Sequence, residues 1–222
     1  MEALLNEEIT SQVKEAFAKL DQPVEVLFFG RQEDCEYCDQ TLQLVEEVTA
    51  LSDQIFLSRY DLEIDADLAE QFNVDKTPGL VIASRENGQL VDYGVRFAGV
   101  PAGHEFSSLI QDIILVSGRD SKLSQQTREM LADLKEPVSL QVFVTPTCPY
   151  CPQAVILAHQ MAMESSLVQA EMVEATEFPD LSSKYRVSGV PQTTINEGAG
   201  HVVGAVPELQ LFAEILRSIN AN

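Results

Sequence analysis

Four cysteines, arranged as two C-x-x-C pairs, are the residues of this chain best suited to chemistry. They are Cys35 with Cys38 and Cys148 with Cys151. A two-residue spacer lets the two sulfur atoms of a pair form a disulfide with little backbone motion. A helix N-terminus also stabilises a nearby thiolate through its unpaired N–H groups and its dipole. The pattern therefore predicts dithiol–disulfide exchange at both pairs.

The two cysteines of a pair are expected to have different roles. The first cysteine, Cys35 or Cys148, begins a helical turn and is predicted to be the nucleophile. The second, Cys38 or Cys151, lies one turn further on and faces the core, so it stays protonated until it resolves the mixed disulfide.

The elements that position these pairs form two copies of one pattern. An offset of 114 residues places residues 10–24 over residues 124–138, and each segment reads as an amphipathic helix, a turn ending in Pro, and a strand. An unbroken apolar strand follows in each copy, at residues 24–29 and 140–144. The C-x-x-C pair, a helix, a second strand and a short acidic helix come next.

A proline stands 43 residues after the first cysteine in both copies, as Pro78 and Pro191. Each proline opens a strand and follows a β-branched residue, Thr77 or Val190. We predict a cis peptide bond between the two residues in both copies. Such a turn leaves backbone groups free to pair with an extended substrate segment. We therefore expect substrate to contact these four residues, together with Pro149 and Tyr150 of the second motif.

After the proline, each copy has a strand, a turn, a further strand and a closing helix. The order α-β-α-β-α-β-β-α predicts an α/β protein made of two tandem folds, each a four-stranded mixed sheet flanked by helices. The predicted units are residues 1–117 and 118–222. No low-complexity linker separates them, so they are expected to pack against each other.

The segment Cys148-Pro149-Tyr150-Cys151 is identical to the glutaredoxin active-site motif. Two such units in one chain resemble the protein disulfide oxidoreductases of archaea and some bacteria, which are tandem thioredoxin-fold proteins. The resemblance implies thioredoxin-like folds and reduction of protein disulfides, sometimes with oxidation or isomerisation. It also implies no bound cofactor beyond the cysteines, and a flavoenzyme like thioredoxin reductase as electron donor.

Two departures from these families concern the site. Thioredoxins carry a buried acid six residues before the first cysteine, where this chain has Phe29 and Val142, so any proton acceptor must come from elsewhere. Residues 144–147 lack the lysine that glutaredoxins place before their motif, and Gly204 is followed by Ala205 rather than by a second glycine. A glutathione-linked glutaredoxin is therefore the alternative rather than the first interpretation.

The two pairs differ in their local charge. Cys148 has only uncharged neighbours, whereas carboxylates surround Cys35, at Glu33, Asp34, Glu36 and Asp39. These charges oppose a thiolate and are expected to raise the pKa of Cys35 by about one unit relative to that of Cys148. The C-terminal pair is therefore predicted to be the main site.

Composition bounds the remaining possibilities. The 222 residues carry 35 Asp plus Glu against 14 Lys plus Arg, a net charge of -21, which disfavours nucleic acid and anionic membranes as partners. The first residues have no signal-peptide pattern, and no apolar run reaches transmembrane length, so the predicted location is cytoplasmic. The oligomeric state is not predicted.

Competing interpretations remain open. The four cysteines could form a zinc site, although the pairs lie 110 residues apart, or each pair could be a purely structural disulfide. The N-terminal pair could be inactive, or the whole chain could be a non-enzymatic relay or scaffold that docks on a flavoprotein. The three histidines are expected at surface or half-buried positions without a catalytic role, at His104, His159 and His201.

Overall fold

Largely apolar segments form the first strand of each half, as the sequence predicts, with Glu25, Ser139 and Gln141 as the polar exceptions. In the computed structural model, which describes residues 3–220, β1 (Val24–Gly30) is buried at every position. β5 (Val138–Val144) is buried at all but two positions, Ser139 and Gln141. Strands with so little exposed surface require cover on both faces of the sheet, and helices supply it.

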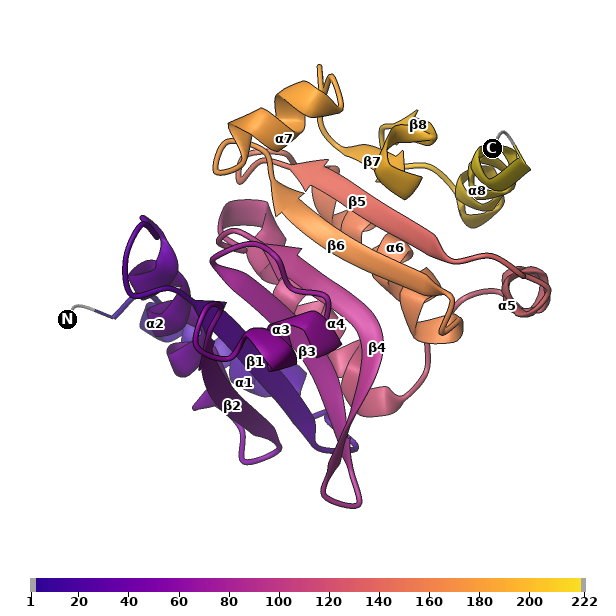
Figure 1. Ribbon diagram of the computed structural model, residues 1–222. Helices are drawn as coiled ribbons and strands as arrows, with labels where there is room; N and C mark the ends of the chain where they lie inside the picture. The colour runs from indigo at the N-terminus through magenta and orange to yellow at the C-terminus, as the bar shows by residue number, and fades with distance from the viewer. Residues whose placement is uncertain (1–2, 221–222) are drawn as a thin grey trace.

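The same order of elements occurs twice along the chain, which confirms the predicted α/β class and tandem arrangement (Figure 1). The first copy contains α1 (Glu7–Phe17), β1, α2 (Cys38–Thr49), β2 (Ile55–Asp61), α3 (Ala66–Gln71), β3 (Gly79–Glu86), β4 (Gln89–Ala98), η1 (Gly103–Glu105) and α4 (Phe106–Gly118). The second contains α5 (Gln125–Ala132), β5, α6 (Cys151–Glu164), β6 (Val168–Glu174), α7 (Pro179–Lys184), β7 (Gln192–Ile195), η2 (Asn196–Gly198), β8 (Gly200–Val203) and α8 (Glu208–Asn220). The boundary between residues 117 and 118 stays a prediction.

The strands of both copies join into a single eight-stranded sheet in the order β2-β1-β3-β4-β6-β5-β7-β8. Within each copy, the first strand pairs in parallel with the second and antiparallel with the third. The copies meet where β4 pairs in parallel with β6, from Val95 opposite Ala170 to Ala98 opposite Val173. The predicted packing of the two halves is therefore a shared sheet, whose hydrogen bonds fix their relative orientation.

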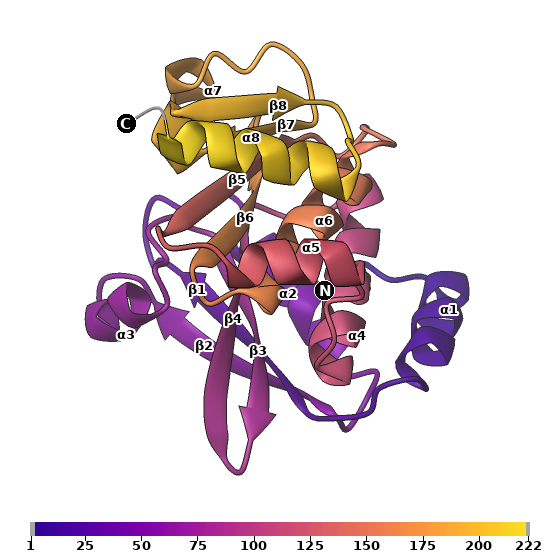
Figure 2. The same cartoon turned by 90° about the vertical axis from the view of Figure 1, so that its right-hand side faces the viewer.

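The two faces of the sheet are covered differently. On one face, a continuous core runs through both halves beneath α1, α2, α4, α5, α6 and α8. On the other, two separate small clusters lie beneath α3 and α7, one in each half. Figure 2 shows α3 on the opposite side of the sheet from α4, α5 and α6.

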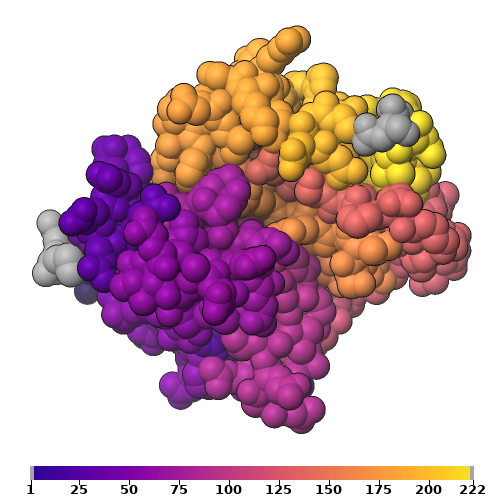
Figure 3. All heavy atoms as spheres, viewed as in Figure 1, coloured from indigo at the N-terminus to yellow at the C-terminus, as the bar shows by residue number. Residues whose placement is uncertain are grey.

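The halves also meet through helices, since α4 of the first packs against α6 of the second. Figure 3 shows the first half, indigo to magenta, in contact with the orange and yellow second half along the seam between them. Within residues 3–220, no helix is long and apolar enough to cross a membrane.

Candidate functional site

Both cysteine pairs lie where a central strand ends and a helix begins, and both form disulfides. Cys35 and Cys38 have Cα atoms 5.4 Å apart, and Cys148 and Cys151 have Cα atoms 5.5 Å apart. The helices begin at the second cysteine, so the first lies in the preceding turn, not in the first helical turn as the sequence suggested. The first cysteine still precedes a helix N-terminus, where unpaired N–H groups favour a thiolate.

The sheet places the two pairs on one edge of the molecule. β1 and β5 both run parallel to β4 and β6, so their carboxyl ends face the same way. Strands β3, β4 and β6 lie between them, which sets the strand ends about 19 Å apart at ~4.8 Å per strand spacing. A single zinc ion cannot be bound by all four cysteines at this separation.

The second cysteine of each pair is the more enclosed one. Cys38 is 7% exposed and Cys151 is fully buried, whereas Cys35 is half-buried and Cys148 is 7% exposed. This burial agrees with the expectation that the second cysteine faces the core. The assignment of nucleophile and resolving cysteine stays a prediction.

The two prolines lie next to the cysteine loops. Both Thr77–Pro78 and Val190–Pro191 are cis, as expected. Gly79 pairs with Phe29 at the end of β1, which places Pro78 beside the segment leading to Cys35. Gln192 pairs with Phe143 in the same manner, which places Pro191 beside the segment leading to Cys148.

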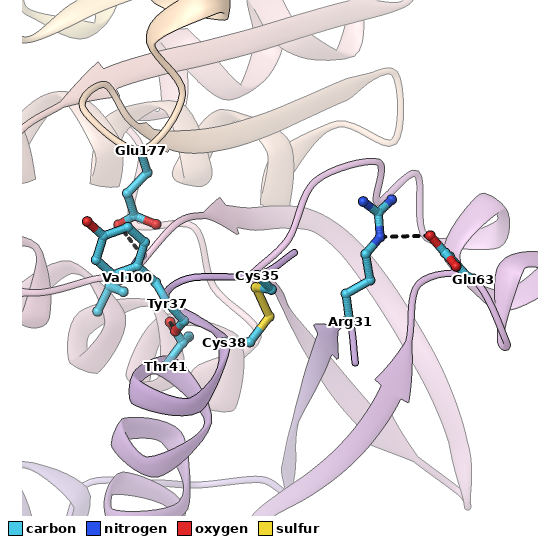
Figure 4. The surroundings of a disulfide bond; sticks show 8 residues. All are labelled: Arg31, Cys35, Tyr37, Cys38, Thr41, Glu63, Val100 and Glu177. Atoms are coloured by element: carbon cyan, nitrogen blue, oxygen red, sulfur yellow. Dashed lines mark hydrogen bonds and ion pairs between the residues drawn. A yellow bond between two sulfur atoms is a disulfide. The ribbon is translucent and has the colours of Figure 1, made fainter. Parts of the chain in front are cut away.

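The tyrosines between the cysteines differ in their surroundings. Tyr150 is 65% exposed, next to the exposed Pro149, and is open to a partner. Tyr37 is half-buried beside Val100 and Glu177, on the opposite side of the disulfide from the ion pair of Arg31 with Glu63 (Figure 4). The C-terminal site therefore presents a free aromatic side chain, whereas the N-terminal one is partly covered.

Phe29 and Val142, which replace the thioredoxin acid, are fully buried, and buried carboxyls come from elsewhere in the chain. Glu105 of η1 is 1% exposed and accepts a hydrogen bond from the Ser108 hydroxyl at 2.6 Å. Its other oxygen has no partner, and burial raises the pKa of Glu105 to about 7.

Although Glu105 belongs to the N-terminal half, η1 lies against the C-terminal site. The His104 N–H donates to the carbonyl of Pro146 at 2.9 Å, two residues before Cys148. Gly103 has a φ of 59°, and a Cβ there would lie 2.2 Å from the same carbonyl oxygen, so only glycine permits this approach. The turn of the N-terminal half that carries the buried Glu105 therefore lies against the loop of the C-terminal pair.

His159 is fully buried, which contradicts the expected surface or half-buried position, whereas His104 and His201 are exposed as expected. Its ring contacts Asp112 from α4, which is also fully buried. Burial raises the pKa of Asp112, and the charge of His159 opposes that rise. The sequence does carry a signal for Asp112, because it falls on the apolar stripe of its helix with Leu109 and Ile113.

A further carboxyl, Glu177, lies in the loop between β6 and α7. Its Oε1 accepts the N–H of Val100 in the N-terminal half at 2.8 Å, and burial raises its pKa to about 7. No spacing in the sequence relates Glu177 to Cys35 or Glu105 to Cys148, because each carboxyl reaches the other half through tertiary contacts.

Comparisons with known proteins agree with this architecture. Residues 138–217 match the thioredoxin domain family. The chain is similar to a protein disulfide oxidoreductase from Aeropyrum pernix, with 33% identity, a TM-score of 0.86, and coverage of 95% of this chain and 91% of that one. It is also similar to the NTD_N/C domain of alkylhydroperoxide reductase AhpF from Enterococcus faecalis, with 25% identity, a TM-score of 0.86, and coverage of 95% and 99%.

Curated proteins similar to this chain include the AhpF component of alkyl hydroperoxide reductase from two bacteria. The protein from Pseudomonas aeruginosa is 26% identical over 203 residues, or 90% of this chain and 35% of that protein. Its counterpart from Staphylococcus aureus is 26% identical over 193 residues, covering 87% of this chain and 34% of that protein. The chain thus spans about a third of the length of these curated relatives.

Proposed function

We propose that the substrates of this chain are the disulfides of other proteins, because it belongs to the family of protein disulfide oxidoreductases built from two thioredoxin folds and is a thiol–disulfide oxidoreductase. The main support is the position of each C-x-x-C disulfide, at a strand end before a helix N-terminus, with the second cysteine enclosed. A buried second thiol is shielded from molecules in solution and can attack the sulfur of the first cysteine, as a resolving cysteine must.

In the proposed reaction, the Cys148 thiolate attacks one sulfur of a substrate disulfide and forms a mixed disulfide. The expelled substrate thiolate takes up a proton. Cys151 then loses its proton and attacks the Cys148 sulfur, which releases the second substrate thiol. The substrate gains two electrons and two protons, and the pair is left oxidised. Cys35 and Cys38 would perform the same steps in the N-terminal half.

We propose that substrate chains lie across the C-terminal site between its two surface-facing features. Tyr150 and Pro149 are exposed between the two cysteines, and half-buried Val190, ahead of Pro191, lies beside the end of β5. The backbone of Val190 can add an extended substrate segment by strand pairing. Thr77 and Pro78 occupy the matching place in the N-terminal half.

Glu105 is the proposed proton acceptor of the C-terminal site. Its pKa of about 7, raised by burial, lets the carboxyl both take up and release a proton near neutral pH. It belongs to η1, whose Gly103 and His104 contact the Pro146 carbonyl in the loop that carries Cys148, and we propose that it replaces the acid missing at Val142.

The source of electrons is proposed to be a separate flavoenzyme resembling thioredoxin reductase. The similarity to a domain of alkylhydroperoxide reductase AhpF over 95% of this chain favours a second role, as a dithiol relay that docks on such a flavoprotein. Cysteines that cycle between thiol and disulfide suit a reducing compartment, so the cytoplasm is the proposed location. No further cofactor is proposed.

The test is reduction of insulin disulfides by the purified chain. With dithiothreitol, we expect turnover that is lost when all four cysteines are replaced by Ser. Thioredoxin reductase with NADPH should replace dithiothreitol as donor. Turnover supported only by glutathione would instead indicate a glutaredoxin, and no turnover with any donor would favour the non-enzymatic scaffold.

A further inference from the structure

Glu177 brings a carboxyl of the C-terminal half to the N-terminal site. Besides its bond to the Val100 N–H, it lies against Gly99, whose φ is 93°. A Cβ at Gly99 would lie 3.0 Å from Glu177 Oε1 and 2.7 Å from the Cβ of Glu174. The N-terminal half thus provides a glycine and an N–H donor where the other half inserts two glutamates.

This carboxyl has little compensation for its charge. Glu177 Oε2 is buried without a hydrogen-bond partner, and so is Oε1 of Glu174, which is itself only 2% exposed. Among residues 3–220, no cation forms an ion pair with either side chain, and Arg31, on the other side of the disulfide, is paired with Glu63.

The titratable groups close to Glu177 are all acids. They are Glu174 from the end of β6, and Glu36 and Tyr37 from the C-x-x-C loop of the N-terminal half. Figure 4 shows Glu177 reaching from the C-terminal half toward Tyr37 and Val100, on one side of the Cys35–Cys38 disulfide. The charge of Glu36 and, to a lesser degree, that of Glu177 raise the pKa of Tyr37, so both carboxylates lie within electrostatic range of this loop.

Glu105 at the other site has different surroundings. It accepts a hydrogen bond from Ser108. The charge of His159 favours the ionised form of Glu105, whereas the charge of Asp112 opposes it. Glu105 therefore has a histidine to offset a neighbouring carboxylate, whereas the charged groups near Glu177 are carboxylates.

We propose that Glu177 is a positioning residue for the N-terminal site, where its charge disfavours negative charge on the Cys35 sulfur and makes Cys35/Cys38 the more reducing pair. The inference rests on the proposed thiol–disulfide exchange. When this pair closes its disulfide, it gives two electrons and two protons to the disulfide it reduces. A destabilised thiolate makes that transfer more favourable and the first attack near neutral pH slower.

The experiment uses the full chain with Cys148→Ser and Cys151→Ser, so that only the N-terminal pair reacts. Glu177→Gln is added, because glutamine keeps the acceptor for the Val100 N–H and removes the charge. The rate of alkylation of reduced Cys35 by iodoacetamide is measured from pH 5 to 10. We expect the Cys35 pKa to fall by about half a unit to one unit, with alkylation at pH 7.5 rising about threefold to tenfold.

The pH profile distinguishes a charge effect from a structural one. Below about pH 6, where Glu177 is protonated, the two variants should react at the same rate, and they should separate as Glu177 ionises. A Cys35 pKa that is unchanged or higher in Glu177→Gln, or rates that differ equally at every pH, would overturn the proposal.

The matched control places Glu177→Gln in the chain with Cys35→Ser and Cys38→Ser, and the Cys148 profile should not move. An equal shift at Cys148 would overturn a role specific to the N-terminal site. Alkylation requires no protein substrate, so insulin reduction measured in parallel tests the proposed function separately. If the chain fails to reduce insulin while Glu177→Gln still lowers the pKa of Cys35, the proposed function is refuted and the role of Glu177 is not.

Discussion

His159 Nδ1 lies 2.6 Å from Asp112 Oδ2, and both side chains are fully buried. His159 belongs to α6 of the C-terminal half and Asp112 to α4 of the N-terminal half. This contact therefore joins the two halves on the face of the sheet that α4 and α6 cover. The other ring nitrogen donates to the carbonyl of Arg96 at 3.1 Å. The helix that begins at Cys151 is thereby bonded to the other half of the chain.

Removing His159 should destabilise the whole protein. His159→Leu leaves the Asp112 carboxyl buried without its partner, which costs about 3 to 5 kcal/mol in the free energy of unfolding. Urea denaturation would measure the loss, and adding Asp112→Asn should recover part of it by removing the buried charge. His201→Leu, at an exposed position, is the control and should change stability by less than about 0.5 kcal/mol. A stability of His159→Leu within about 1 kcal/mol of the parent would contradict a buried pair.

Glu105 should make stability depend on pH. Its pKa in the folded protein is raised to about 7, so the folded state holds the proton more tightly than the unfolded chain. Stability is therefore fully retained below about pH 4.5 and falls as the pH rises to about 7, by about 2 to 3 kcal/mol from this group. Glu105→Gln should lack this decline, so the difference between the two unfolding curves should grow from pH 5 to pH 7. A constant difference would show that Glu105 ionises normally.

The two cysteines of the C-terminal pair should fail in different ways when replaced. In a chain with Cys35→Ser and Cys38→Ser, adding Cys148→Ser should abolish disulfide exchange. Adding Cys151→Ser instead should trap a mixed disulfide with substrate, since no second thiol is left to resolve it. Nonreducing gels followed by mass spectrometry would identify the linked cysteine. Trapping by the Cys148→Ser chain would reverse the assignment.

The two sites should differ in thiol pKa and in turnover. The exposed carboxylates beside Cys35 and the proposed effect of Glu177 act in the same direction, whereas the residues next to Cys148 in the sequence are uncharged. We expect the chain that keeps only Cys148/Cys151 to have the lower thiol pKa, by about one unit, and most of the insulin reductase turnover. Iodoacetamide titration and the insulin assay on the two double mutants would measure both. A larger share of turnover from Cys35/Cys38 would show that local charge does not govern these sites.

Much of the fold could be read from local patterns in the sequence. The buried strand from Val24 to Gly30, the helix after each cysteine pair and the positions of Pro78 and Pro191 follow from apolar runs, helical periodicity and a repeated spacing. Such patterns act between residues close in sequence, so each half carries the information for its own elements. The same spacing identified the four cysteines and the missing acid at Phe29 and Val142.

The shared sheet and the carboxyls beside the sites could not be predicted in this way. Pairing of β4 with β6 joins residues 75 positions apart, and only the packing of both halves selects it. Glu105 has no acidic neighbour in the sequence and Glu177 lies in an acidic stretch, so neither position is distinctive, and burial in the folded chain is what raises their pKa values. Sequence alone determined which residues carry the redox chemistry. Tertiary structure decided which carboxyls surround them, because desolvation depends on neighbours that come from the other half of the chain.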